Sequence, residues 1–165
     1  MSEIKRRVAN EGDLQAVHAI YTDKSVSRYL GYEPMPLDDF RLVFTELLAD
    51  GGFFVVEQEC SVVGFYRIIR NKGRTAHVAR LGTLAVAPPV QGKGVAENML
   101  TQVIDELRES GVKRIELIVE SDNPRALSFY KRFGFVKEGT LKNFYKRAEE
   151  KNYIDDYLMA RIFDG

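Results

Sequence analysis

Hydrophobic and polar residues recur along this chain with two different periods, which predict strands and helices in succession. Short β-branched and aromatic runs between turn residues are typical of strands, and apolar residues three and four positions apart are typical of amphipathic helices. This pattern predicts strands at 4–8, 53–57, 62–69, 77–87, 114–120, 135–144 and 153–162 and helices at 14–21, 37–50, 95–110 and 123–132. The order predicts a mixed α/β fold.

The elements between residues 77 and 120 form a strand–helix–strand unit, which requires two parallel neighbouring strands with a right-handed crossover. The last two strands are predicted to pair antiparallel around a polar tip. Asp13 is expected to be the N-cap of the first helix. Residues 25–36 are expected to be irregular, because they contain Gly31 and two prolines. No linker or repeat interrupts the pattern, so residues 1–165 are predicted to form a single domain.

Composition narrows the class of protein. Apolar residues make up 45% of the 165 positions, which is enough for a packed core. Lysine plus arginine equals aspartate plus glutamate, 24 each, so we expect no nucleic-acid partner and no membrane partner. Cys60 is the single cysteine, which excludes an internal disulfide and favours a reducing compartment. With no signal peptide or membrane-spanning run in the sequence, we expect a cytoplasmic protein.

The glycine-rich stretch 90–96 is the most informative local feature. It follows an apolar strand and opens the amphipathic helix, so its backbone N–H groups are expected at the positive end of the helix dipole. That arrangement is suited to binding phosphate. The dinucleotide fingerprint does not fit, because its last glycine is replaced by Glu97, and the nucleoside-triphosphate loop lacks its Ser or Thr after Lys93.

Two motifs together indicate a family. The loop contains Gln-x-x-Gly-x-Ala at Gln91, Gly94 and Ala96, and residues 123–135 contain Asn-x-x-Ala-x-x-Phe-Tyr-x-x-x-Gly-Phe. In this order and spacing they resemble the GCN5-related N-acetyltransferases, the GNAT family. The resemblance is good over residues 76–160 and extends to the N-terminal half only in element order. It implies a central, mostly antiparallel sheet of about seven strands with a splayed parallel pair and four flanking helices.

The resemblance also implies acetyl-coenzyme A as cosubstrate, with no metal. The loop would hold the pyrophosphate, and the pantetheine would pair with backbone groups between the splayed strands 81–87 and 114–120. The cofactor-binding residues expected on this basis are Leu84, Ala85, Val86, Gln91, Gly92, Lys93, Gly94, Val95, Ala96, Asn123 and Tyr130. Gln91 would order the loop or bind a phosphate, and Lys93 would add a charge or remain a surface lysine. Asn123 would cap its helix, bind pantetheine, or do both.

Tyr130 is the catalytic acid that the resemblance implies, since the family places a tyrosine beside the coenzyme sulfur. A phenol can protonate a departing thiolate, because their ordinary pKa values are about 10 and 8.5. The alternative is a core aromatic residue. The base is less defined. Related ribosomal-protein alanine acetyltransferases carry a glutamate where this chain has Ile118. Glu116 and Glu120 flank that position on the same strand face and are the predicted catalytic bases.

His77, Glu57 or a chain of water molecules are alternatives for the base, and each side chain could equally be structural. Tyr29, Tyr32 and Tyr145 are predicted to line the acceptor site, because the family uses segment 25–36 and the last hairpin there. The expected acceptor and partner is a small primary amine such as an amino acid. A protein N-terminus or lysine is the alternative acceptor, and a non-catalytic acyl-CoA-binding module is the alternative function. An aromatic-rich surface would be compatible with a homodimer.

Overall fold

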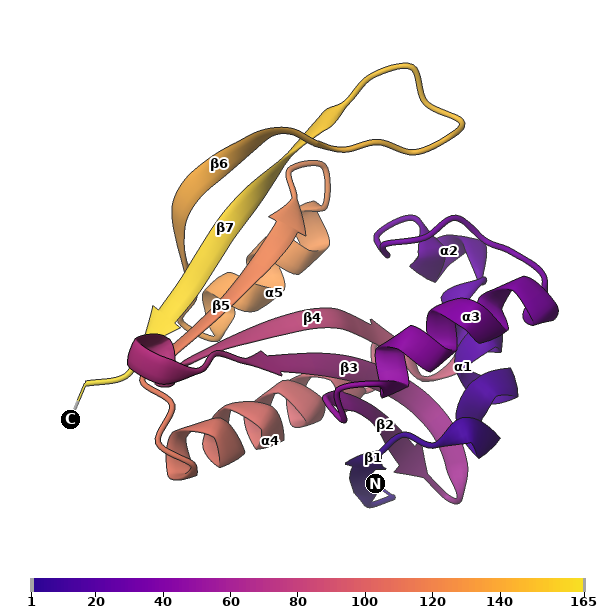
Figure 1. The fold of residues 1–165 in the computed structure, drawn as a ribbon, viewed down its shortest axis with the longest axis horizontal. Coiled ribbons are helices and arrows are strands. Elements are labelled where there is room, and N and C mark those ends of the chain that lie inside the picture. Colours follow the sequence, from indigo (N-terminus) through magenta and orange to yellow (C-terminus); the bar gives the residue numbers. More distant parts are fainter. Residues whose placement is uncertain (1, 165) are drawn as a thin grey trace. The chain divides into compact units, whose positions relative to one another are not determined.

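The computed structural model describes residues 2–164. Within them, seven strands are hydrogen-bonded in the order β1-β2-β3-β4-β5-β7-β6 (Figure 1). The strands are β1 (Ile4–Val8), β2 (Phe53–Gln58), β3 (Ser61–Arg70), β4 (Val78–Val86), β5 (Arg114–Glu120), β6 (Val136–Tyr145) and β7 (Ile154–Ile162). The helices are α1 (Leu14–Tyr21), α2 (Lys24–Ser27), α3 (Leu37–Leu48), α4 (Val95–Glu109) and α5 (Pro124–Arg132), with short 3-10 turns at Glu11–Asp13, Gly73–Thr75 and Pro88–Val90.

The chain divides into two compact units. The first comprises the residues up to Ile69 together with Thr83–Asp105, and the second comprises Arg70–Gly82 together with the residues from Glu106 onward. The first unit contains β1–β3, α1–α3, the end of β4 and most of α4. The second contains the start of β4, the end of α4, and β5, α5, β6 and β7. Each unit is described separately.

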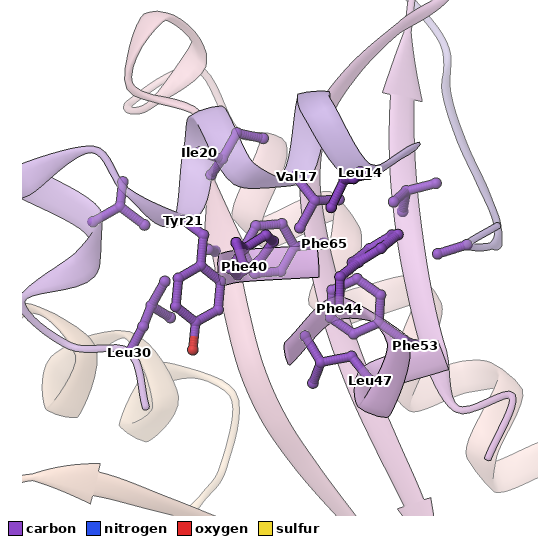
Figure 2. Packing of buried hydrophobic residues seen from close by; sticks show 14 residues of the cluster. Leu14, Val17, Ile20, Tyr21, Leu30, Phe40, Phe44, Leu47, Phe53 and Phe65 are labelled. Atoms are coloured by element: carbon purple, nitrogen blue, oxygen red, sulfur yellow. The ribbon is translucent and has the colours of Figure 1, made fainter. Parts of the chain in front are cut away.

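The core of the first unit lies between α1, α3 and the strands β2 and β3. Figure 2 shows aromatic and aliphatic side chains from these four elements pointing toward one another. Phe40 and Phe65 are fully buried, and the Tyr21 ring packs against both of them, with centroids 5.1 and 5.9 Å away. The buried positions of α1 and α3 recur at helical spacing, which is the pattern that predicted the two helices.

The predicted cap of α1 is wrong in its detail. Asp13 is the residue before the helix, but its side chain makes no capping bond there. Its carboxylate instead accepts two hydrogen bonds from Arg7, both of 2.8 Å, and one from the backbone N–H of Asn10. Arg7 also binds Glu57 at 2.9 Å, so this cluster ties β1 and β2 to the start of α1.

The segment 25–36 is less irregular than expected, because it begins within α2. Asp23 caps this four-residue helix by accepting hydrogen bonds from the backbone N–H and hydroxyl of Ser25. With α2 the described residues contain five α-helices rather than the four that the family resemblance implies. Val26 and Leu30 point into the core, which explains why this segment is held in place.

Gly64 on β3 permits a close approach at the point where β4 leads into the glycine-rich loop. A Cβ atom at this position would lie 2.8 Å from the carbonyl oxygen of Ala85 and 3.2 Å from the sulfur of Met99. The first distance is too short for a Cβ atom and the second is tight, so glycine lets α4 pack directly over the strands. The start of α4 is therefore fixed beside the end of β4.

The second unit is built on the strands β5, β7 and β6. β5 pairs antiparallel with β7 over its full length, from Arg114 opposite Ile162 to Glu120 opposite Asp156. β6 pairs antiparallel with β7, as the sequence predicted, and the two strands run side by side in Figure 1. The predicted parallel pair is confirmed: residues 78–80 of β4 pair with residues 114–116 of β5.

Candidate active site

The glycine-rich loop has the backbone conformation that an anion site requires. Gly92 and Gly94 have φ values of +75° and +81°, which L side chains rarely adopt. Nothing lies within 4 Å of the place where a Cβ atom would stand on either residue. α4 begins at Val95, so its first N–H groups lack partners within the helix. The loop therefore fits the predicted binding of a diphosphate group.

Gln91 orders this loop. Its side-chain amide donates a 2.9 Å hydrogen bond to the carbonyl oxygen of Val86, at the end of β4. The bond fixes the chain reversal through Pro88–Val90. Gln91 was expected to order the loop or to bind a phosphate, and the ordering role is observed. A direct bond to phosphate stays a prediction. Of the neighbouring residues, Lys93 is exposed, whereas Val95 is buried and anchors the first turn of α4.

β4 contains a distortion directly before the residues predicted to bind the coenzyme. Thr83 has a φ of +54°, which is an outlier for a β-branched residue inside a strand. Such a conformation costs about 1–3 kcal/mol and is found mainly at functional sites. It changes the direction of the backbone just before Leu84, Ala85 and Val86, the residues predicted to pair with pantetheine. Their role stays a prediction.

Asn123 caps α5 in the second unit. Its side-chain oxygen accepts a 3.2 Å hydrogen bond from the backbone N–H of Ala126, and Pro124 occupies the first helical position. The structural role predicted from the Asn-Pro sequence is confirmed. The amide nitrogen of Asn123 is not needed for the cap, so the predicted bond to pantetheine is compatible with it.

Tyr130 is held among aromatic rings in the second unit. Its ring meets Phe129 and Phe135 edge to face, with centroids 5.3 and 5.7 Å away. Burial raises the pKa of the Tyr130 phenol well above its ordinary value, and the negative charge of Glu120 raises it further. The phenol therefore remains protonated at any pH near neutrality, which is the state that a proton donor needs.

Glu120 is buried at the end of β5, with 8% of its surface exposed. Burial raises the pKa of its carboxyl to about 7; the charges of Asp156 and Asp122 also raise it, while the backbone N–H of Glu120 itself and Arg147 lower it. A carboxyl that titrates near pH 7 can accept a proton and release it again under ordinary conditions. Of the two predicted bases, Glu120 has the suitable environment.

Glu116 has the opposite environment on the same strand. Its carboxylate accepts hydrogen bonds from Arg80 at 2.8 Å and from Arg114 at 3.0 and 3.1 Å, and Arg114 also pairs with Glu138. Burial alone would raise the pKa of Glu116, but the two arginines outweigh it and hold the pKa below its ordinary value. A carboxylate in this state is a weak base, so Glu116 is better explained as part of an ion-pair network.

Three charged residues beside Glu120 were not singled out from the sequence. Asp156 on β7 lies opposite Glu120 in the strand register and is 97% buried, since only 3% of its surface is exposed. Arg147 is also buried and binds Asp122 through two hydrogen bonds of 2.8 and 3.1 Å. The sequence signal for Asp156 was its place on a strand face that it shares with the apolar residues Leu158 and Ala160.

The other candidate bases are engaged or exposed. Glu57 binds Arg7 across β1 and β2. The side chain of His77 is exposed, while its carbonyl oxygen accepts the backbone N–H of Lys113 at 2.8 Å. Cys60 is exposed at the tip of the β2–β3 hairpin with a φ of +63°, as expected for a turn residue.

The three predicted acceptor-site tyrosines lie in different surroundings. In the first unit, Tyr29 is half-buried with the Arg28 guanidinium 5.7 Å from its ring, and Tyr32 is 45% exposed. In the second unit, Tyr145 is half-buried, and the Arg147 guanidinium lies 5.0 Å from its ring. Tyr145 is thereby connected through Arg147 to the charged residues around Glu120, and the role of all three stays a prediction.

Within residues 2–164, no set of three or more His, Cys, Asp or Glu side chains is arranged to hold a metal ion. None of the helices in this range combines the length and apolar character needed to cross a membrane.

Comparison with known proteins agrees with the loop and the helix motif. A model of the acetyltransferase (GNAT) family matches residues 14–135. The L-amino acid N-acetyltransferase AaaT of Escherichia coli is 34% identical over 98% of this chain and 99% of its own. The solved spermidine N-acetyltransferase of Vibrio cholerae in complex with CoA and spermine superimposes with a TM-score of 0.80 at 25% identity, covering 96% of this chain and 95% of that one.

The ribosomal-protein-alanine N-acetyltransferase of Brucella melitensis is similar as well, with a TM-score of 0.75 and 27% identity over 96% of this chain and 99% of that chain. The family match includes the glycine-rich loop of the first unit and the Asn123–Tyr130 motif of the second. The chain therefore belongs to the acetyltransferase (GNAT) family and is an acetyl-CoA-dependent N-acyltransferase.

Proposed function

We propose that this enzyme transfers the acetyl group of acetyl-CoA to a small primary amine, such as an amino acid, by direct transfer without a covalent enzyme intermediate and without a metal. The observation that carries the proposal is the pair formed by Glu120 and Tyr130. Burial gives Glu120 a pKa of about 7 and keeps Tyr130 protonated. Two titratable groups with separated pKa values are what a reaction with one proton acceptor and one proton donor requires.

Each residue has one task in this proposal. Acetyl-CoA supplies the thioester whose acetyl group the amine nitrogen attacks. Glu120 takes a proton from the acceptor's ammonium group, which frees the nitrogen lone pair. Backbone N–H groups of Leu84–Val86 stabilise the negative charge that develops on the carbonyl oxygen, and losing one such donor typically costs about 3 kcal/mol. Tyr130 donates its proton to the sulfur as the carbon–sulfur bond breaks, and the second proton that the nitrogen loses on becoming an amide restores the phenol.

The pKa of Glu120 favours an α-amine over a lysine side chain. An α-ammonium group has an ordinary pKa of about 8 and a lysine ammonium of about 10.4, so proton transfer to a base of pKa about 7 is less unfavourable from the α-amine. The similarity to an L-amino acid N-acetyltransferase supports the same acceptor class. Ile118 stands where the ribosomal-protein alanine acetyltransferases carry a glutamate, which disfavours a protein N-terminus.

The family match runs through both compact units, from residue 14 to residue 135. This supports the prediction that residues 1–165 act as one N-acetyltransferase domain.

The experiment is a free-thiol assay with acetyl-CoA and a panel of amino acids, polyamines and short peptides, after coenzyme binding has been confirmed by calorimetry. We expect thiol release that depends on the amine and is fastest with an amino acid. Release with peptides alone would replace the small amine by a protein acceptor. Tight coenzyme binding with no release across the panel would favour an acyl-CoA-binding module, and no binding would refute the proposal.

A further inference from the structure

One buried charged group has no role in the reaction described so far. Asp156 is 97% buried in the second unit, and its Oδ1 atom has no hydrogen-bond partner within residues 2–164. A buried acceptor without a partner is unfavourable, so it is rare in native proteins and calls for an explanation. Its neighbour Asp155 shows the contrast, because that carboxylate accepts the backbone N–H of Asn143 at 2.9 Å and the ammonium of Lys142 at 3.2 Å.

The strand register places Asp156 next to the proposed base. Asp156 on β7 and Glu120 on β5 are directly opposite in the antiparallel pair, so their side chains extend from the same face of the sheet. Residues in such positions have Cβ atoms about 4.5–5.5 Å apart. A group that binds to Asp156 on this face would therefore lie next to Glu120.

The charges around Asp156 favour a cation. Glu120, Asp122 and Asp155 add negative charge near it, and Arg147 partly opposes them. The Arg147 guanidinium makes two hydrogen bonds to Asp122 and one of 3.2 Å to Glu150. A carboxylate oxygen in these surroundings is a stronger acceptor for an ammonium group than for an uncharged group.

We propose that Asp156 binds the acceptor, with Oδ1 accepting a hydrogen bond from the ammonium group and holding it beside Glu120. One proton then passes from the ammonium nitrogen to the Glu120 carboxylate, which leaves a neutral carboxyl group and a free amine. The inference rests on the proposed function and narrows the class of acceptors. The enzyme selects acceptors by the positive charge on the reacting nitrogen, through a residue that is separate from the base.

A structural alternative makes a different prediction. Asp156 and Glu120 could share one proton and satisfy each other without an acceptor, as closely placed carboxyl groups do. In that case the side chain of Asp156 would contribute to folding and to the state of Glu120, but it would not discriminate between charged and uncharged ligands.

The test compares Asp156→Asn with Asp155→Asn, which removes the same charge one residue away on the other face of β7. The substrate is the amine of the thiol-assay panel with the highest kcat/KM. For Asp156→Asn we expect the amine KM to rise by about 10-fold or more, as for loss of a hydrogen bond to a charged group. The KM of acetyl-CoA should not change, and Asp155→Asn should keep both constants. Equal amine KM values in wild type and Asp156→Asn would overturn the inference.

A second measurement does not depend on the variant folding. Two inhibitors with the same carbon skeleton are compared in the wild type, one carrying an ammonium group and the other a hydroxyl group in its place. Each is tested as a competitive inhibitor against the amine substrate. We expect the ammonium compound to bind at least about 10-fold more tightly, and equal inhibition would contradict the inference. If the wild type acts on no amine of the panel, the proposed function fails as well. If it acts but shows no preference for charge, only the role of Asp156 is wrong.

Discussion

Tyr130 keeps its proton beside Phe129 and Phe135, and its raised pKa means that the phenol releases this proton only to a strong base such as the departing thiolate. We predict that Tyr130→Phe lowers kcat by about 100-fold, the lower range for loss of a general acid, because the departing sulfur then lacks its proton donor. The ring contacts are retained, so the affinity for acetyl-CoA measured by calorimetry should change little. Tyr157→Phe, a half-buried tyrosine on β7, is the matched control. Unchanged turnover in Tyr130→Phe would refute the acid role.

Glu120 gives a prediction about pH. The carboxyl must be deprotonated to accept a proton, so kcat/KM should rise with pH and level off above the pKa of about 7. The charged and titratable groups that act on Glu120 or respond to it are Asp122, Arg147 and Asp156, together with Tyr130 on α5. In Glu120→Gln the rising part of the profile should disappear, with activity at pH 8 lower by about 100-fold. A variant profile with the same rise near pH 7 would show that another group is the base.

At this scale the sequence identified residues that belong to local motifs and missed those that depend on pairing between distant segments. Asn123 was predicted as a cap because Pro124 follows it directly. The burial of Asp156 follows from its pairing with Glu120, 36 positions earlier, and no local pattern reports that contact. Glu116 and Glu120 were equivalent in the sequence, and the structure separated them by the arginines around Glu116 and by the burial of Glu120.

The helices and strands were predicted well where a hydrophobic period was sustained. β1 and β5 have the predicted bounds, and α4 ends one residue early. α2 was missed because four residues are too few to show a helical period, and its cap at Asp23 lies in a stretch followed by glycine and proline. The distortion at Thr83 was not foreseen, since a β-branched residue in an apolar run favours a regular strand.

The glycine-rich loop gives a prediction at the scale of the element. Gly94→Glu would place a carboxylate in the open space before α4 and force a left-handed backbone on an L residue, so we expect loss of acetyl-CoA binding by calorimetry. Gly73→Glu is the control, because Gly73 has a φ of +63° and equally open surroundings outside the loop. Both variants should fold and lose similar stability. Coenzyme binding that survives in Gly94→Glu would refute the loop assignment.

For the molecule as a whole, stability depends on pH through carboxyl groups of two opposite kinds. Hydrogen bonds from Arg7 hold the pKa of Asp13 below its ordinary value, so this pair stabilises the fold above that ordinary value and the contribution is lost as pH falls. Burial raises the pKa of Glu120 and Asp156 to about 7 and about 6. These two groups favour folding less as pH rises, because ionisation is easier in the unfolded chain.

Two substitutions on β5 separate these contributions. Glu120→Gln removes a buried carboxyl whose pKa is raised, so it should leave the free energy of unfolding unchanged at pH 4 and increase it progressively up to about pH 7. At pH 8 the increase should approach about 3 kcal/mol, since one pKa unit corresponds to about 1.4 kcal/mol. Glu116→Gln removes a carboxylate that Arg80 and Arg114 stabilise, so it should decrease the free energy of unfolding at pH 8. Urea unfolding at both pH values measures each difference. A change of the same sign in the free energy of unfolding of both variants at pH 8 would contradict the assignment of Glu120 as a buried carboxyl that is costly to ionise. An increase for Glu120→Gln alone would show that the proposed base is retained at the expense of stability.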